Sequence, residues 1–178
     1  MRIENEFLKA KNTISDIHEH IDTLYNLAKE CSHITEMGIR NVVSTWAFIF
    51  RDPEKLVGID LHTNGSVLLT KEIYPKWEFI QADTTKIEIE KTDLLFIDTL
   101  HTYSQLKKEL NLHAVNVNKY IALHDTTTYG HIDESTSGGD KEGLVPAITE
   151  FLESNKDWSI LKEYTNNNGL TILERNNA

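Results

Sequence analysis

The stretch DLLFIDTLHTY, residues 93–103, reads as a buried strand that ends in an acid, a short turn and a histidine. Its apolar run, residues 94–97, shows no polar alternation, which is typical of a strand covered on both faces in a parallel sheet. Ligands of open α/β sheets bind just beyond the carboxyl ends of the strands. Asp98 and His101, which follow this run, are therefore candidate functional residues.

A second stretch, YIALHD at residues 120–125, repeats this design. Its apolar run is followed by His124 and Asp125. If the two strands are parallel neighbours, their ends lie at the same edge of the sheet. We therefore expect these two residues to lie close to Asp98 and His101.

Strands and helices are expected to alternate along the rest of the chain. Apolar runs predict strands at 33–37, 55–60, 77–83, 93–98 and 120–125, and a hairpin of 158–164 and 170–175 around an Asn/Gly turn. Apolar residues at three- and four-residue intervals or helix-stop signals predict helices at 13–30, 44–50, 66–74, 102–118 and 144–152. This alternation predicts an α/β fold with a largely parallel sheet, helices on both faces and one antiparallel strand.

Acidic residues close the first three strands as well. Glu36 precedes a turn at Gly38, and the following helix begins near Ser44, an arrangement that presents backbone amides to a polar ligand. Asp60 follows Gly38 by 22 residues, close to the ~20-residue spacing of a ribose-binding acid in nucleotide-binding α/β folds. Asp83 follows the third strand. Three acids at successive strand ends indicate a ligand site.

Length and composition indicate one domain, residues 1–178, with its own core. Residues 126–143 are polar and unpatterned, as in a lid or a disordered loop. His18 and His20 lie on or near the polar side of the predicted first helix and read as solvated histidines rather than as a metal pair.

Charge and hydropathy argue against several classes of partner. The net charge is −10, from 18 basic and 28 acidic residues, and no Lys/Arg cluster is present, so we expect no nucleic acid partner. No apolar run approaches the ~20 residues of a membrane helix, so we expect no membrane partner. A single cysteine, Cys31, and an N-terminus without a signal-peptide pattern fit a cytoplasmic protein.

The stretch EMGIRNVVST, residues 36–45, followed by acids at later strand ends and a C-terminal hairpin, resembles the class I S-adenosylmethionine-dependent methyltransferases. The similarity extends over about residues 14–175. The most similar group is the small O-methyltransferases related to macrolide and aminocoumarin sugar methyltransferases and to cephalosporin-hydroxylase-like proteins, in which a pattern like FIDTLHTY is followed by an acidic pair, here HD. The resemblance implies a seven-stranded Rossmann-like sheet in the order 3-2-1-4-5-7-6 with strand 7 antiparallel.

The resemblance also implies roles for individual residues. It implies cofactor contacts from Glu36, Gly38, Ser44, Thr45, Asp60, Asp83 and Asp98, and divalent metal ligands, for Mg²⁺ or another cation, from Asp98, His124 and Asp125. Within that set, Asp60 would accept the ribose hydroxyls and Asp83 the adenine amino group, beside Ala82 and Thr84. The substrate would be a small hydroxylated acceptor such as a sugar.

Two positions depart from the family pattern. Val42 and Val43 stand where a glycine is usual, which would put bulk where the cofactor lies against bare backbone. Leu100 stands where a second acid often serves as base, which leaves His101 as the catalytic proton acceptor beside Asp98.

Other interpretations of these residues stay open. The same acid and histidine cluster could serve a metal-dependent hydrolase that uses no S-adenosylmethionine, or the chain could be a non-catalytic relative that only binds the cofactor. Asp98 could instead cap the following helix, and His124 with Asp125 could be a loop-start pair bonded to the backbone. Asn166–Asn168 could be a simple turn or a hydrogen-bonding rim for an acceptor. The acceptor and the oligomeric state stay open.

Overall fold

The computed structural model describes residues 2–134 and 142–176. The strands are β1 (His33–Met37), β2 (Lys55–Asp60), β3 (Trp77–Gln81), β4 (Thr92–Ile97), β5 (Val117–His124), β6 (Trp158–Tyr164) and β7 (Leu170–Arg175). The helices are α1 (Arg2–Asn12), α2 (Ile21–Leu27), α3 (Thr45–Arg51), α4 (Gly65–Ile73), α5 (Tyr103–His113) and α6 (Leu144–Ser154), with short 3₁₀ helices η1 (His18–His20), η2 (Ala28–Glu30) and η3 (Ala114–Asn116).

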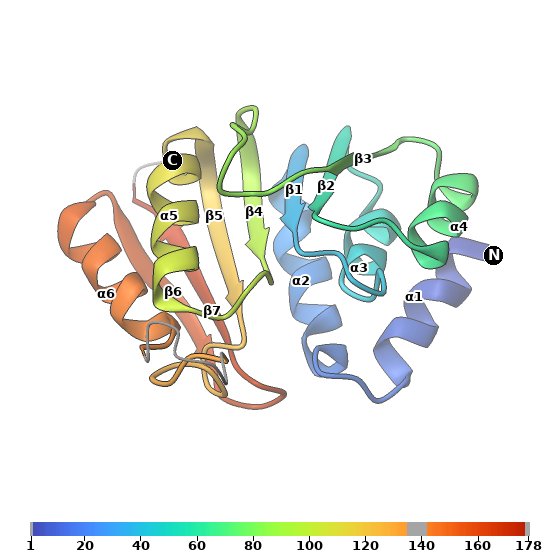
Figure 1. Ribbon diagram of the computed structural model, residues 1–178. Helices are drawn as coiled ribbons and strands as arrows, with labels where there is room; N and C mark the ends of the chain where they lie inside the picture. Colours follow the sequence, from blue (N-terminus) through green and yellow to red (C-terminus); the bar gives the residue numbers. More distant parts are fainter. Residues whose placement is uncertain (1, 135–141, 177–178) are drawn as a thin grey trace.

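The strands form one seven-stranded sheet in the order β3-β2-β1-β4-β5-β7-β6 (Figure 1). Strands β1 to β5 pair in parallel, and β7 pairs antiparallel with both β5 and β6. The predicted order and the predicted antiparallel strand 7 are both confirmed.

The central strand β4 supplies side chains to both faces of the sheet. Leu94 and Phe96 belong to one buried cluster, whereas Leu95 and Ile97 belong to the other. All four side chains are at least 96% buried. Because successive side chains on a strand point to opposite faces, an unbroken apolar run is what a doubly covered strand requires.

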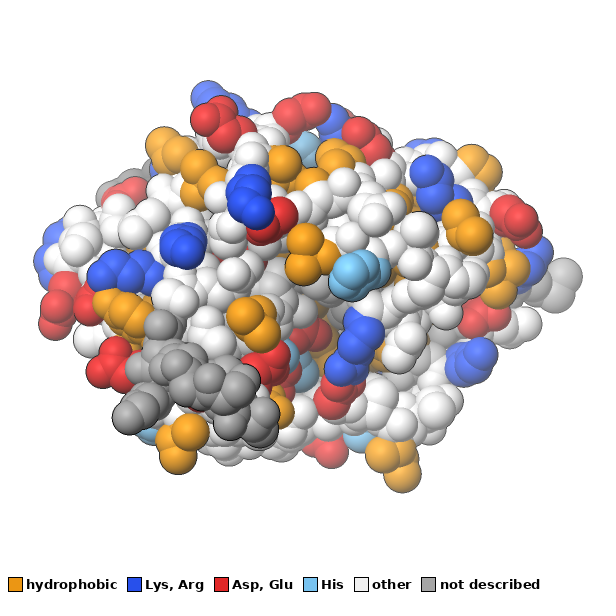
Figure 2. Space-filling model, in the orientation of Figure 1, with side chains coloured by type: hydrophobic (Ala, Val, Ile, Leu, Met, Phe, Trp, Pro, Cys, Tyr) orange, Lys and Arg blue, Asp and Glu red, His pale blue; other side chains and the backbone are white. Residues whose placement is uncertain are grey.

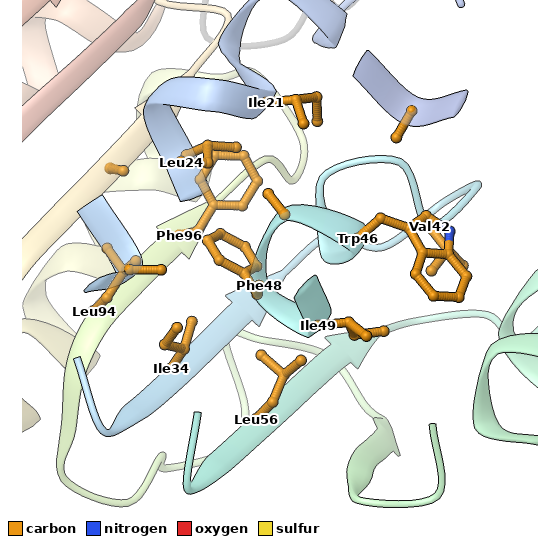
Figure 3. Packing of buried hydrophobic residues seen from close by; sticks show 14 of the residues in the cluster. Ile21, Leu24, Ile34, Val42, Trp46, Phe48, Ile49, Leu56, Leu94 and Phe96 are labelled. Atoms are coloured by element: carbon orange, nitrogen blue, oxygen red, sulfur yellow. The ribbon is translucent and has the colours of Figure 1, made fainter. Parts of the chain in front are cut away.

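Helices cover the two faces in two groups (Figure 1). The first cluster packs α1, α2 and α3 against the sheet, and Figure 3 shows Phe48, Phe96 and Leu24 meeting in its centre. The second cluster packs α5 and α6 against the opposite face. The prediction of helices on both faces is therefore confirmed, and each cluster packs against one face of the sheet.

Local signals explain where two of the helices begin. The Asn64 side chain accepts hydrogen bonds from the main-chain amides of Ser66 and Val67, at 2.9 and 3.1 Å, and so caps α4. Thr102 caps α5 in the same way by accepting from the amide of Gln105 at 3.3 Å. Asp98 is therefore not the N-cap of α5.

The N-terminal prediction was wrong in its bounds and continuity. Instead of one helix over 13–30, the chain has η1, α2 and η2 in succession between residues 18 and 30, preceded by α1. The spacing of Ile3, Phe7 and Ala10 carried the missed signal for α1, and Phe7 and Ala10 are buried. His20 is 1% exposed, so its interpretation as a solvated histidine was also wrong.

Two other boundaries differ from the prediction. The crossover helix, expected to run to residue 118, ends at His113, and β5 begins at Val117 rather than at Tyr120. Strand β3 ends at Gln81, so Asp83 lies in the following turn. In both cases an element begins or ends a few residues from its predicted position, because the sequence pattern is weakest at the ends of elements.

The predicted lid-like loop, 126–143, lies partly outside the described residues, since 135–141 are not described. Its two described flanks are joined, because the amides of Leu144 and Val145 donate to the carbonyl oxygens of Tyr129 and Gly130 at 2.9 and 2.8 Å. A lid role stays a prediction. Within the described ranges, no helix is long and apolar enough to span a membrane.

Candidate functional site at the strand ends

The carboxyl ends of β1, β2, β4 and β5 are aligned by the sheet register. Met37 pairs with Ile59 on one side and with Ile97 on the other, and Ile97 pairs with Leu123. The residue that follows each of these four therefore lies at a common edge. The site is built from these residues and from the turns behind them.

A cavity of about 360 Å³ opens at this edge between β2, β3 and β4. We call it the strand-end cavity; it is lined by Gly38, Arg40, Ile59, Asp60, Leu61, His62, Ala82, Asp83, Thr84, Thr85, Asp98, Thr99, Leu100 and Gln105. A second cavity of about 210 Å³, the adjoining cavity, shares Gly38, Arg40, Asp98 and Thr99 with it and reaches His101 and Glu134. Acidic and histidine side chains are visible in a recess near the centre of this face in Figure 2.

Gly38 sets the closeness of β1 to β4 at this edge. Its φ angle is +84°, and a Cβ atom there would lie 2.0 Å from the main-chain oxygen of Asp98. Only glycine combines this backbone conformation with this approach. Gly38 therefore occupies the position that the sequence predicted, and it is shared by both cavities.

Asp60 holds the turn after Gly38. Its Oδ2 atom accepts hydrogen bonds from the amides of Ile39 and Arg40 at 2.7 and 3.0 Å, and its Oδ1 atom accepts from the amide of His62 at 2.9 Å. The carboxylate thus shapes the wall of the strand-end cavity before any ligand is present. Oδ1, with a single donor, retains acceptor capacity.

Asp83 lies at the far side of the same cavity. Its Oδ1 atom accepts from the amide and hydroxyl of Thr85 at 2.9 and 2.7 Å, and Oδ2 lies 2.8 Å from the ammonium of Lys86. These partners lower the pKa of Asp83 to about 2, with the Lys86 contact as the largest cause. Asp83 is therefore an ionised acceptor on the cavity wall.

Glu36 lies behind the Gly38 turn and is fully buried. The Ser44 hydroxyl donates to its Oε1 atom, whereas Oε2 has no hydrogen-bond partner among the described residues. Burial raises the pKa of Glu36 to about 8, although the Ser44 hydrogen bond opposes the shift. Thr45 follows Ser44 and is also buried. A buried acid with an unpaired oxygen is unusual and marks a site that a polar ligand could complete.

The valine pair does not obstruct the strand-end cavity. Val42 is 1% exposed and packs in the first core cluster beside Trp46, as Figure 3 shows. Its φ angle of +64° turns the side chain inward at a cost in backbone strain. Val43 borders the adjoining cavity. Val42 therefore lines neither of the two cavities at the strand ends, and its effect on cofactor binding stays a prediction.

Two carboxylates and two imidazoles meet at the ends of β4 and β5. The Nε2 atom of His101 lies 3.2 Å from Oδ1 of Asp98 and 3.0 Å from Oδ2 of Asp125. The Nδ1 atom of His124 lies 3.4 and 3.1 Å from the same two oxygens. The predicted convergence of these four residues is thus present in the structure, and we call them the acid-histidine cluster.

The cluster stabilises charge on all its members. Burial lowers the pKa of His101, but the hydrogen bonds and charges of Asp125 and Asp98 outweigh it and raise the pKa to about 10. The same balance raises the pKa of His124 to about 9. Burial opposes ionisation of Asp98 and Asp125, yet the imidazoles hold the pKa of both carboxyls below the usual value. Near neutral pH both rings are therefore protonated.

Glu134 was missed by the sequence reasoning. Its carboxylate contacts Nδ1 of His101, while the Tyr129 ring stacks on the imidazole with centroids 5.0 Å apart and the planes 1° from parallel. Both residues come from the loop after β5, which showed no pattern in the sequence. The motif HIDE, residues 131–134, offered only a histidine and two acids in a long polar loop.

The ligand atoms that converge best for a cation belong to Asp98, His101 and Asp125, all within 4.8 Å of one another. The Oδ1 atom of Asp125 is buried and has no hydrogen-bond partner among the described residues. His124 contacts both carboxylates, but its side chain is fully buried and its Nε2 atom faces the carbonyl oxygen of Asn167 at 3.2 Å. The donor set suits a hard divalent cation, because it offers oxygen atoms and one imidazole.

The asparagine turn is bonded within the protein. Asn167 donates to the carbonyl oxygen of Ser15 at 2.9 Å and accepts from the amide of Glu19 at 2.9 Å. The side-chain oxygen of Asn168 accepts from the Thr128 hydroxyl at 3.0 Å. These bonds favour the interpretation as a structural turn that joins the N-terminal segment to the hairpin.

Solved structures show the same architecture. The N-methyltransferase NodS from Bradyrhizobium japonicum in complex with S-adenosyl-L-homocysteine aligns with a TM-score of 0.68 and 14% identity over 99% of this chain and 97% of that chain. A putative caffeoyl-CoA O-methyltransferase from Staphylococcus aureus aligns with a TM-score of 0.69 and 14% identity, over 98% and 92%. A methyltransferase from Podospora anserina bound to S-adenosylhomocysteine aligns with a TM-score of 0.65 and 14% identity, over 98% and 88%.

The fold is thus the Rossmann-like fold seen in class I S-adenosylmethionine-dependent methyltransferases. At these identities the likeness establishes a shared fold. No protein-family model matches the sequence, and no curated protein sequence matches it significantly.

Proposed function

We propose that this protein is an S-adenosylmethionine-dependent methyltransferase that transfers a methyl group to the hydroxyl of a small acceptor. The observation that carries the proposal is the strand-end cavity. It is lined by Gly38, Asp60 and Asp98 and lies where the strand order reverses in a methyltransferase-type sheet. At about 360 Å³ it lies in the size range of small-molecule and cofactor sites.

The residues of the cavity fit the parts of this cofactor. Asp60 Oδ1 has acceptor capacity for a ribose hydroxyl, and Asp83 is an ionised acceptor near the place of the base. Glu36 has an unpaired buried oxygen next to Ser44, near where the amino-acid part of the cofactor would lie. When bound, the cofactor supplies an electrophilic methyl group on a sulfonium.

The acid-histidine cluster would act on the acceptor. Methyl transfer is a displacement, so the protein must align the acceptor oxygen and remove its proton. Asp98 borders both cavities and His101 borders the adjoining one, where an acceptor hydroxyl would approach the cofactor. We assign His101 as the proton acceptor and Asp98 as the residue that orients it.

A protonated His101 cannot accept a proton, and a cation bound to the neighbouring carboxylates would change this. Asp98 and Asp125, with His124, would hold a divalent ion such as Mg²⁺, which would supply a Lewis acid that lowers the pKa of a hydroxyl. Carboxylates engaged in this way no longer stabilise the extra proton on His101, so its imidazole becomes available as a base.

The lining of the adjoining cavity favours a polar acceptor. Arg40, Asn41, Ser44 and Glu134 offer donors and acceptors around it. A sugar or another small polyhydroxylated molecule fits this chemistry better than an apolar acceptor does. The protein would then act on a small molecule, and its acidic surface gives no footprint for nucleic acid.

Calorimetric titration with S-adenosylmethionine and S-adenosylhomocysteine, with and without Mg²⁺, tests the proposal. We expect both ligands to bind the wild type, and we expect Asp60→Ala to weaken binding about a hundredfold, because the turn at Ile39 and Arg40 loses its anchor. Glu78→Ala, an exposed acid on β3, is the matched control and should bind as the wild type does. Binding of Mg²⁺ with no response to either cofactor form would favour a hydrolase instead.

A further inference from the structure

Glu109 is a buried acid that the proposed mechanism does not use. It lies on the inner face of α5 between Leu106 and Leu110, and its side chain is fully buried. An acid at such a position is unusual unless donors satisfy it. Its partners place it directly behind the wall of the strand-end cavity.

Three donors surround the Glu109 carboxylate. Oε1 accepts from the Thr84 hydroxyl at 2.5 Å and from the Gln105 amide nitrogen at 2.8 Å, and Oε2 accepts from the Thr99 hydroxyl at 2.8 Å. Burial raises the pKa of Glu109, while these three donors favour its ionised form. All three partners line the strand-end cavity, whereas Glu109 does not.

The three partners come from separate elements. Thr84 follows β3, Thr99 follows β4, and Gln105 lies in the first turn of α5. One carboxylate therefore fixes the positions of three segments that meet at one side of the cavity. The opposite side is formed by Gly38 and Asp60.

This carboxylate also fixes which end of the Gln105 amide faces the cavity. The amide nitrogen carries two hydrogens, and it lies 2.8 Å from Glu109 Oε1 and 3.3 Å from Thr84 Oγ1. A reversed amide would place its carbonyl oxygen against a carboxylate, which is repulsive. The Gln105 carbonyl oxygen is therefore the amide atom left for the cavity.

The two threonine hydroxyls add to the same effect. Both donate their protons to Glu109, so only their lone pairs remain for a ligand. Asp83 on the neighbouring turn is also an acceptor. This side of the cavity therefore presents acceptors, and Leu100 and Ala82 provide apolar surface beside them.

We propose that Gln105, as a second acceptor beside Asp83, accepts a hydrogen bond from the exocyclic amino group of a purine, and that Glu109 is the positioning residue that holds the Gln105 amide in the accepting orientation. The inference rests on the proposed function, since it concerns the adenine of the cofactor. A 6-amino purine donates to this wall, whereas a 6-oxo purine would place an oxygen against its acceptors. The wall thus selects adenine over hypoxanthine.

The test compares two ligands that differ at this group. S-adenosylhomocysteine and its 6-oxo analogue S-inosylhomocysteine are titrated into the full chain by calorimetry. We expect the wild type to prefer the adenosyl ligand about tenfold to a hundredfold, because the 6-oxo ligand would leave one acceptor of the cavity wall without a donor. Gln105→Leu should weaken adenosyl binding about tenfold, leave inosyl binding nearly unchanged, and so remove most of the preference.

Glu109→Gln tests the positioning role. The variant keeps the shape of the side chain but replaces a carboxylate that accepts at both oxygens with an uncharged amide that also donates. The Gln105 amide is then no longer held in one orientation, so the preference should fall severalfold while the ribose contacts persist. Gln81→Leu is the matched control, because Gln81 is exposed, donates to the carbonyl oxygen of Leu61 and does not line the cavity. It should keep the wild-type preference.

The possible failures are distinct. Equal weakening of both ligands by Gln105→Leu would show a structural role only and overturn the inference. A wild type that binds S-adenosylhomocysteine without any preference would overturn it too, while leaving the proposed function intact. A wild type that binds neither ligand would overturn the proposed function and, with it, this inference. Gln105 is partly exposed, so its variant remains informative if Glu109→Gln fails to fold.

Discussion

The carboxylates on the two sides of this sheet edge are satisfied in opposite ways. On the side of β2, Asp60 accepts three main-chain amides and shapes a turn around an open cavity. On the side of β5, Asp98 and Asp125 face the imidazoles of His101 and His124. The first carboxylate organises backbone, and the second pair neutralises charge.

The two regions therefore differ in what must change before a ligand can bind. At Asp60 the wall of the strand-end cavity is held by main-chain amides, so a ligand that contacts this carboxylate displaces no ion pair. In the acid-histidine cluster, a cation must compete with two protonated rings for the same oxygens. We therefore expect cation binding to strengthen as the rings lose their protons.

The largest effect is expected at Gly38, on the cavity side of the comparison. Gly38→Ala should lower the free energy of unfolding by about 4 kcal/mol, because its Cβ would collide with the Asp98 backbone and the φ angle is positive. Gly65→Ala is the control, since no atom lies within 4 Å of a Cβ there, and it should change stability by less than about 1 kcal/mol. Urea unfolding measures both, and equal effects would contradict the close approach of β1 to β4.

The second-largest effect is expected in the acid-histidine cluster. Asp125→Asn keeps a residue that tolerates the φ angle of 61° but removes the charge facing two protonated rings. We expect a loss of about 3 kcal/mol at pH 7. Because the pKa of His101 is raised from 6.5 to about 10, the stabilisation is full below pH 6.5 and is lost as pH rises through 10.

The matched control for that variant is Asp52→Asn. Asp52 also has a positive φ angle, but its ion pair with Lys76 is exposed, so the loss should stay below about 1 kcal/mol. Unfolding at pH 7 and pH 10.5, each compared with the wild type at the same pH, measures the difference. A loss for Asp125→Asn that does not shrink at high pH would show that the rings are neutral in the native state.

The smallest effect is expected at Glu36, which lies behind the Gly38 turn that both cavities share. Its pKa is raised from 4.5 to about 8, so its stabilising contribution is full below pH 4.5 and is lost as pH rises through 8. Glu36→Gln should therefore match the wild type near pH 5 and exceed its stability by about 2 kcal/mol near pH 8.5. Glu163→Gln, an exposed acid on β6, should show no such dependence. Parallel pH profiles for Glu36→Gln and the wild type would mean that folding does not raise the pKa of Glu36.

Much of the fold followed from local pattern. The apolar run of β4 predicted a doubly covered strand, and the acids at the carboxyl ends of β1, β2 and β4 predicted which edge carries the candidate site. The Asn/Gly turn predicted the hairpin, and Gly169 indeed has a φ angle of +95° there. These signals are readable because each depends on residues close in sequence.

Other features depended on contacts that the sequence does not display. Val42 was expected to crowd a ligand, but its backbone conformation turns it into the core beside Trp46. His20 was expected in solvent, but it packs edge-on against His124 and bonds to the Asn166 carbonyl oxygen at 3.0 Å. Glu134 reaches His101 from a loop without any pattern.

The sequence by itself determined the succession of strands and helices along the chain, the edge at which the acids gather and the glycine turn, because periodicity and residue type act over a few neighbouring positions. Only the tertiary structure decided how each carboxylate is satisfied. Whether an acid such as Asp60, Asp98 or Glu109 meets amides, imidazoles or hydroxyls depends on segments that lie far apart in the chain. Those partners set the charge of each acid, and with it the chemistry the site can perform.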